Sequence, residues 1–154
     1  MSESSFLVSL LTSGSSGNAT YIETPQRKIL VDCGLTGKAI AAQMEKIGRS
    51  VADIDTILVT HEHVDHIKGI GVLARKYGMD IYANEKTWKA MENKNIGVIK
   101  QEQKHLFEPG VTKTFGDIDV MSFAVSHDAA SPQFYSFQKD QKQFVMLTDT
   151  GYVS

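Results

Sequence analysis

The sequence predicts a mixed α/β fold in which helices cover β-sheets. Short apolar runs alternate with segments of helical periodicity as far as Glu92, and strand patterns alone follow. Such a change, from alternating strands and helices to a meander of strands, is typical of sheets covered by helices. The 154 residues suffice for one domain with a sizeable core.

The first strands are marked by a turn and by apolar runs. Small residues at 13–18 form the turn signal, and Ile29, Leu30 and Val31 make the continuous apolar run expected of a buried strand. The later strand patterns are short and either apolar or alternating. The predicted strands are 6–12, 19–24, 28–32, 54–60, 79–83, 117–126, 133–138 and 143–148, with a hairpin turn at 139–141.

Three helices are predicted from apolar residues at helical spacing. The first begins with Thr36 as its N-cap and ends before Gly48. The second follows the segment 61–66 and ends at Gly78, and the third spans 85–92. The predicted core-facing residues are, in chain order, Ile40, Met44, Ile47, Ile70, Leu73, Ala74, Tyr77, Trp88 and Met91.

The end of the chain raises a question about its sheet. The last recognisable strand ends at Asp149, so the sheet that contains it needs a further helix to cover one face. We therefore expect residues 1–154 to form a single domain that is incomplete at its C-terminus, the N-terminal portion of something longer. A truncated sheet with an exposed apolar face is also expected to self-associate.

Composition excludes several classes of protein. The formal net charge of −2 argues against nonspecific nucleic-acid binding through bulk charge. No apolar stretch approaches the roughly 18 residues that cross a membrane, and the N-terminus lacks the basic and apolar regions of a secretory signal. The single cysteine, Cys33, rules out an internal disulfide and suits a reducing cytoplasm, where we expect the protein to reside.

Weaker signals have ordinary structural interpretations. We expect His105 to have a surface or packing role because it lacks a partner motif, and Cys33 to be a buried structural thiol because no base lies nearby. Asp128 either supports its neighbour His127 or is exposed. A solvated helix face and loop explains a group of central lysines better than a binding surface does. These lysines are Lys86, Lys89, Lys94, Lys100 and Lys104.

The segment 61–66 carries the strongest chemical signal, because it places three histidines and an aspartate directly after an apolar strand. His61 and His63 point the same way if the strand continues, whereas Glu62 points away. Asp65 and His66 lie where the backbone turns into the next helix and can face a second position. Imidazole and carboxylate donors suit zinc, manganese or iron rather than calcium, and α/β sheets place such sites at the carboxyl ends of their strands.

This segment resembles the signature loop of the metallo-β-lactamase fold superfamily, whose members form an αββα sandwich with a dinuclear metal site at its edge. Segments 30–34, 126–128 and 147–151 resemble other superfamily motifs in the same order. The turn at 12–18 is similar to those of the nuclease and phosphodiesterase branches, including RNase J and tRNA-processing relatives. The likeness is greatest to the YycJ/WalJ group of bacterial cytoplasmic proteins, which are linked to exonuclease activity on DNA.

The resemblance implies two divalent metal ions, manganese or zinc, with iron also open. Asp32, at the end of an early strand, would support the metal loop without binding metal. The implied ligands are His61, His63 and His127 for one ion, Asp65 and His66 for the other, and Asp149 for both. Family members carry one more histidine beyond the position of residue 154, so we expect the second site to be incomplete in this chain.

The expected reaction is metal-dependent phosphodiester hydrolysis, with DNA as the favoured substrate. Two adjacent divalent ions acidify a shared water enough to supply hydroxide near neutral pH, and Asp65 would act as metal ligand, proton acceptor or both. A small-molecule phosphodiesterase and a hydrolase of small esters, thioesters or lactams are alternatives on the same fold. From a different class, the chain is a catalytically incomplete fragment or a metal-binding interaction module.

The metal content of the chain tests the ligand assignment. We expect about one tightly held ion per chain rather than two, because the second site lacks a ligand and an incomplete donor set binds weakly. Elemental analysis after dialysis gives this number. A stoichiometry of zero would overturn the ligand assignment.

Overall fold

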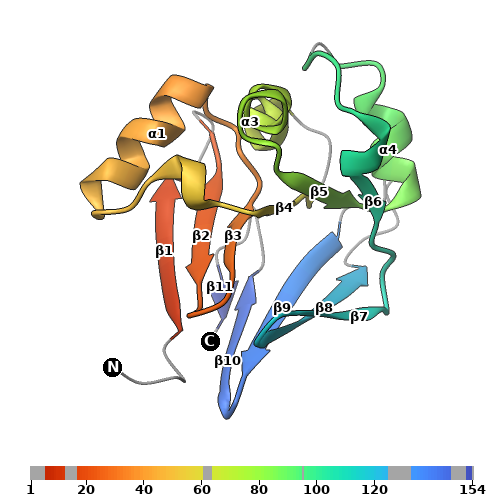
Figure 1. The fold of residues 1–154 in the computed structure, drawn as a ribbon. Helices are drawn as coiled ribbons and strands as arrows, with labels where there is room; N and C mark the ends of the chain where they lie inside the picture. Colours follow the sequence, from red (N-terminus) through yellow and green to blue (C-terminus); the bar gives the residue numbers. More distant parts are fainter. Residues whose placement is uncertain are drawn as a thin grey trace.

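The computed structural model describes residues 6–12, 17–60, 64–94, 96–124, 133–146 and 152–153. Two β-sheets lie face to face, and the helices cover the outer face of the first sheet (Figure 1). The fold is therefore mixed α/β, as the sequence predicts. Among the described residues no helix is long and apolar enough to cross a bilayer.

The first sheet has six strands whose order across the sheet is their order along the chain. Its first three strands pair antiparallel, whereas the third to the sixth pair parallel. The parallel strands therefore end at the same edge of the sheet, which is where α/β folds build their sites. The strands are β1 (Leu7–Thr12), β2 (Ala19–Glu23), β3 (Lys28–Val31), β4 (Thr56–Leu58), β5 (Asp80–Ala83) and β6 (Lys104–Leu106).

The second sheet is an antiparallel meander of five strands in the order β11-β10-β9-β8-β7. The predicted hairpin turn joins β9 to β10, and Asp140 in it has a left-handed φ of +56°. The strands are β7 (Thr112–Phe115), β8 (Ile118–Ala124), β9 (Gln133–Lys139), β10 (Lys142–Met146) and β11 (Tyr152–Val153).

Several helix ends lie where the sequence indicates, but the predicted second helix is divided in two, because Lys68 and Gly69 interrupt it. Thr36 caps the first helix because its side-chain oxygen accepts a hydrogen bond from the Ala39 backbone N–H. Two helices are followed by glycines, Gly48 and Gly78. These glycines have left-handed φ angles of +74° and +71°, which glycine adopts without steric cost. The helical segments are α1 (Gly37–Lys46), η1 (Val51–Asp53), α2 (Val64–Ile67), α3 (Ile70–Tyr77), α4 (Glu85–Met91) and η2 (Gln101–Gln103).

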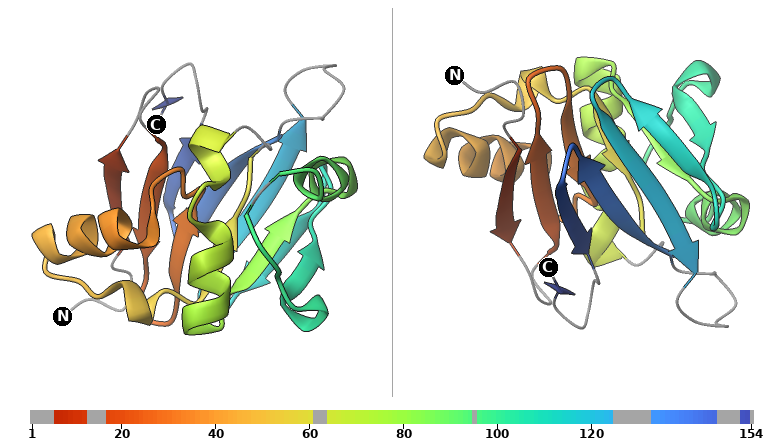
Figure 2. Two further views of the ribbon diagram at one scale, coloured as in Figure 1. Left: turned by 90° about the horizontal axis from the view of Figure 1, so that it is seen from above. Right: turned by 90° about the horizontal axis from the view of Figure 1, so that it is seen from below.

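Two separate cores hold the layers together. The first lies between the helices and the first sheet, and all but three of the predicted helix residues are buried in it; Ile47, Tyr77 and Trp88 pack at its border. The second core lies between the two sheets and includes Phe107, Phe137 and Tyr135. The described residues thus form three layers, α/β/β, and none of their helices covers the outer face of the second sheet (Figure 2).

Three strands were not predicted from the sequence, and one predicted strand is much shorter than expected. The three are β6, β7 and β11. The Lys-His-Leu sequence of β6 has no alternation, and only parallel pairing with β5 makes it a strand. The strand predicted at 54–60 is shorter, because a 3-10 turn precedes β4 and the Thr60 backbone N–H bonds to a side chain instead of a neighbouring strand.

Gly69 permits the closest approach of two segments near the end of β3. Its backbone N–H donates to the Cys33 carbonyl at 2.9 Å. A Cβ added at Gly69 would lie 2.1 Å from the Leu35 carbonyl oxygen, which is backbone and has little freedom to move. Only glycine therefore fits between α2 and α3 at this distance.

We predict that Gly69→Ala lowers the free energy of unfolding by about 3 kcal/mol, because the added methyl group overpacks a buried contact. Gly37→Ala is the matched control, since its Cβ would meet only the half-exposed Val72 side chain at 3.0 Å. That variant is expected to change stability by less than about 1 kcal/mol. Urea denaturation measures both, and equal effects of the two variants would contradict the prediction.

Candidate metal centre

The candidate centre lies at the carboxyl edge of the first sheet. The strands β3 and β4 run parallel there, with Val31 opposite Leu58. Asp32 directly follows β3, and Thr60 lies two residues after the end of β4. The His-rich segment begins at the next residue, His61. Parallel pairing thus brings an early aspartate beside the start of the predicted metal loop.

Asp32 holds the end of β4 through both carboxylate oxygens. Its Oδ1 accepts a hydrogen bond from the Thr60 backbone N–H at 2.8 Å, and its Oδ2 accepts one from Thr60 Oγ1 at 2.6 Å. The carboxylate is fully buried. Its backbone has a φ of +62°, a left-handed conformation that aspartate tolerates better than most residues. These contacts are the ones that a carboxylate needs to support a loop.

The same carboxylate orients the imidazole of His66, which is 1% exposed. His66 Nδ1 lies 2.7 Å from Asp32 Oδ2, and since an ionised carboxylate only accepts hydrogen bonds, Nδ1 carries the proton. In the neutral ring Nε2 then bears the lone pair, and Asn18 Nδ2 lies 3.2 Å from it. This tautomer is the one that binds a metal through Nε2, with a carboxylate behind the ring.

Backbone hydrogen bonds join three segments around this imidazole. The Cys33 N–H donates to the His66 carbonyl at 2.8 Å, and the Gly34 N–H donates to the Asn18 carbonyl at 2.9 Å. The start of β2, the end of β3 and helix α2 are therefore fixed to one another. Asn18 ends the small-residue turn of the sequence, so that turn ends beside the predicted metal site.

Cys33 has the structural role predicted from the sequence. Its side chain is fully buried, and Sγ lies 3.4 Å from the Leu35 carbonyl oxygen. Burial raises the pKa of the Cys33 thiol to about 12. The thiol therefore stays protonated at neutral pH, where only a thiolate would act as nucleophile or metal ligand.

The second sheet reaches the same strand end through two residues that the sequence analysis did not identify. The Gln133 backbone N–H donates to the Thr60 carbonyl at 2.9 Å, and the Tyr135 hydroxyl donates to the Val59 carbonyl at 2.6 Å. Both residues are fully buried on β9. The signal in the sequence is limited to a glutamine and a tyrosine at alternate positions of a strand of mixed polarity.

Of the other predicted ligands, only Asp65 lies within the residues that the structure describes. The backbone of Asp65 lies in α2 beside His66, as the sequence predicts for a turn into a helix. The remaining ones lie outside the described residues: His61, His63, His127 and Asp149, together with Asp128. Among the described side chains, no three His, Cys, Asp or Glu residues gather as a metal-binding group. The ligand set accordingly stays a prediction.

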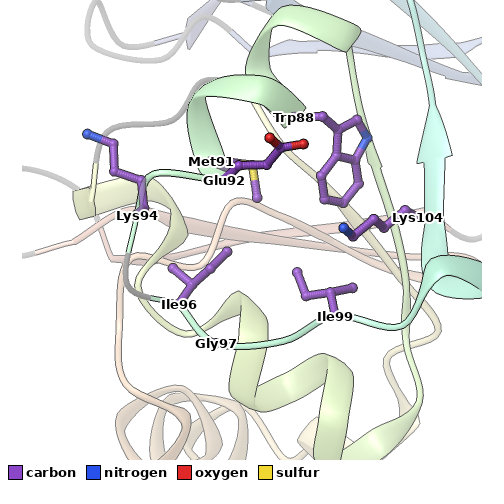
Figure 3. A pocket seen from close by; sticks show the side chains of 8 residues that line it. All are labelled: Trp88, Met91, Glu92, Lys94, Ile96, Gly97, Ile99 and Lys104. Carbon is purple, nitrogen blue, oxygen red and sulfur yellow. The ribbon is translucent and has the colours of Figure 1, made fainter.

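His105 and the central lysines lie away from this edge. His105 stacks on Tyr82 with ring centroids 4.6 Å apart, and its Nε2 lies 3.1 Å from Asp80 Oδ1, which is the packing role expected. A pocket beside α4 is lined by eight residues, among them Trp88 and Lys104 (Figure 3). The Lys104 Nζ lies 5.7 Å from the centre of the Trp88 ring.

The lysines predicted to form a solvated surface are exposed, apart from Lys104, which is half-buried. Exposed acidic residues, including Glu85, Glu92 and Glu102, alternate with them along the chain. The surface around α4 is therefore of mixed charge, as expected of a solvated helix face and loop.

Comparison with known proteins identifies similar sequences and folds. Residues 27–154 match the model of the beta-lactamase superfamily domain. The chain is 64% identical to the exodeoxyribonuclease WalJ of Streptococcus pneumoniae over 155 aligned positions, which cover all of this chain and 58% of that protein. It is 56% identical to the exodeoxyribonuclease YycJ of Bacillus anthracis, covering 95% of this chain and 55% of that protein.

A solved structure shows the same fold at low sequence identity. A metallo-β-lactamase from Cronobacter sakazakii superposes with a TM-score of 0.75 and 21% identity, covering 90% of this chain and 60% of that one. The metallo-β-lactamase-like fold expected from the sequence is thereby confirmed. The chain spans little more than half the length of the two exodeoxyribonucleases that it resembles.

We predict that Asp32→Asn weakens metal binding by about 10- to 100-fold, because the amide group no longer fixes the Nδ1-protonated tautomer of His66. The control is Asp55→Asn at the opposite end of β4, where the carboxylate accepts hydrogen bonds from Arg27 Nε and the Lys28 backbone N–H. Asp55→Asn should leave metal affinity unchanged. Competition with a chromogenic chelator measures both affinities, and an unchanged affinity in Asp32→Asn would refute the role of Asp32.

Proposed function

The chain belongs to the beta-lactamase superfamily, and from this premise we propose that its protein is a metal-dependent hydrolase that cleaves phosphodiester bonds of DNA. The observation that carries the proposal is the Asp32–His66 pair at the carboxyl edge of the first sheet, which fixes the imidazole in the metal-binding tautomer. The substrate class rests on two similar proteins that are named exodeoxyribonucleases. We propose further that residues 1–154 belong to a single domain and that the protein is cytoplasmic.

The proposed metal ligands come from both sheets. Two divalent ions, manganese or zinc or iron, suit a set of imidazoles and carboxylates. Support comes from His66, whose Nε2 has the required lone pair, and from the position of Asp65 beside it in α2. The proposed ligands are His61, His63 and His127 for one ion, Asp65 and His66 for the other, and Asp149 for both.

In the proposed mechanism the ions supply an acidified water and neutralise charge on a phosphoryl oxygen. The protein's own residues hold the geometry. Asp32 keeps the proton on His66 Nδ1 and fixes the Thr60 backbone, so neither the ring nor the loop has to reorient during the reaction. We assign to Asp65 the role of proton acceptor. Cys33 takes no part, because its thiol stays protonated.

The test uses the protein at its natural full length, with manganese and end-labelled single- and double-stranded DNA. We expect nucleotide release by the wild type and a loss of at least about 100-fold in His61→Ala and Asp149→Ala, since each removes a proposed ligand. His105→Ala is the matched histidine control, because that ring stacks on Tyr82 away from the site, and it should retain activity.

Two outcomes would contradict the proposal. Hydrolysis of a thioester or a lactam reporter with DNA left intact would assign the site to small molecules. Equal nucleotide release by the wild type and His61→Ala would mean that the proposed metal site does not cleave DNA.

A further inference from the structure

A buried chain of polar side chains crosses from α4 to the end of β4. It consists of Asn84, which is 1% exposed, and of Gln133 and Tyr135, which are fully buried. Asn84 follows β5 as the N-cap of α4, whereas the other two residues lie on β9 of the second sheet. These side chains therefore connect the two sheets through hydrogen bonds within an otherwise apolar interior.

Each hydrogen bond in this chain has a defined direction. Asn84 Nδ2 donates to Gln133 Oε1 at 2.9 Å, and Gln133 Nε2 donates to the Tyr135 hydroxyl oxygen at 2.8 Å. The Tyr135 hydroxyl donates in turn to the Val59 carbonyl at 2.6 Å. Burial raises the pKa of Tyr135, so the hydroxyl stays protonated and keeps its donor. Gln133 Nε2 also donates to the Phe107 carbonyl at 2.8 Å.

These polar groups would destabilise the fold if they lacked hydrogen-bond partners, because they are buried among apolar side chains. Tyr135 belongs to the core between the sheets, where its ring packs 5.5 Å from that of Phe107. Buried amides and hydroxyls are tolerated only when they are hydrogen-bonded, and a fully bonded network fixes one arrangement of its members. The network thus gives this part of the core a specific geometry that apolar packing alone does not require.

The network ends where the predicted metal loop begins. Val59 and Thr60 are the last two residues before His61, and their carbonyls accept from the Tyr135 hydroxyl and the Gln133 backbone N–H. On the other side, Asp32 accepts from the Thr60 N–H. The end of β4 is consequently held from both sheets at once.

Gln133 also anchors one end of the segment that carries a proposed ligand. It pairs with Ala124 across β8 and β9, and the connection between these two residues, 125–132, contains His127. The same residue therefore bonds to the base of the loop with His61 and to the base of the segment with His127.

We propose that Asn84, Gln133 and Tyr135 form a positioning relay that sets the distance between the metal ligands of the first sheet and the His127 segment of the second. This inference rests on the proposed function. None of the three touches a reacting atom; they act through the backbone of Val59 and Thr60. Removal of a relay hydrogen bond should loosen the spacing of the ligands and weaken metal binding.

The experiment compares Tyr135→Phe with Tyr21→Phe in the full-length protein, by chelator competition with manganese or zinc and by thermal unfolding. Each variant removes one hydroxyl from a fully buried tyrosine. Tyr135→Phe removes the hydrogen bonds with Gln133 and Val59, whereas Tyr21→Phe removes the one to Glu23 at 2.7 Å in the other core. We expect Tm to fall in both variants, and further in Tyr135→Phe because it loses two buried hydrogen bonds. Metal affinity should fall about tenfold in Tyr135→Phe, as for other supports of metal ligands, and stay unchanged in Tyr21→Phe.

A double variant adds an internal check. Gln133→Met combined with Tyr135→Phe should weaken metal binding by less than the product of the single effects, because both act on one network. Metal affinity in Tyr135→Phe equal to that of the wild type, despite a lower Tm, would overturn the relay. If wild-type protein binds metal normally but leaves DNA intact, the proposed function fails while a weakened affinity in Tyr135→Phe still supports the relay. A wild-type protein that binds no metal would overturn both.

Discussion

The candidate site depends on the buried carboxylate of Asp32. One side chain, from the end of β3, accepts hydrogen bonds from the backbone and hydroxyl of Thr60 and fixes the protonated nitrogen of His66. A buried carboxylate is costly unless its lone pairs are satisfied, and here three donors from two segments meet that requirement. Removal of the carboxylate would free the imidazole and leave the end of β4 held only by its bonds to Gln133 and Tyr135.

The parallel pairing of β3 and β4 makes this arrangement possible. With Val31 opposite Leu58, the residues after both strands leave the sheet at the same edge. The left-handed backbone of Asp32 then directs its side chain across to Thr60 instead of along its own strand. Backbone strain of this kind is retained at sites where the surrounding structure fixes it.

At this edge the described residues of the second sheet hold the backbone of the first sheet in position. Gln133 and Tyr135 bond to the carbonyls of Thr60 and Val59, and so connect β9 of the second sheet to the residues that precede His61. The proposed site, with ligands after strands of both sheets, would need such a connection, because each sheet could otherwise shift as a unit. The same requirement explains why buried amide and hydroxyl groups persist in an apolar interior.

Local features of the chain were predictable from the sequence by itself. The N-cap at Thr36, the helix end at Gly48 and the cluster at 61–66 depend on residues close in the chain, and such signals are carried by neighbouring side chains. The sequence also indicated that Asp32 supports the loop, through its resemblance to a family motif.

Only the tertiary structure decided the features that depend on distant partners. The strand β6 exists because Lys104–Leu106 pairs with β5, and the role of Gln133 exists because β9 lies against the end of β4. A glutamine within a strand has no local signature of its hydrogen-bond partners, since these lie many residues away in the chain. The sequence thus determined which residues could bind a metal, while long-range pairing decided what holds His66 and Thr60 in place.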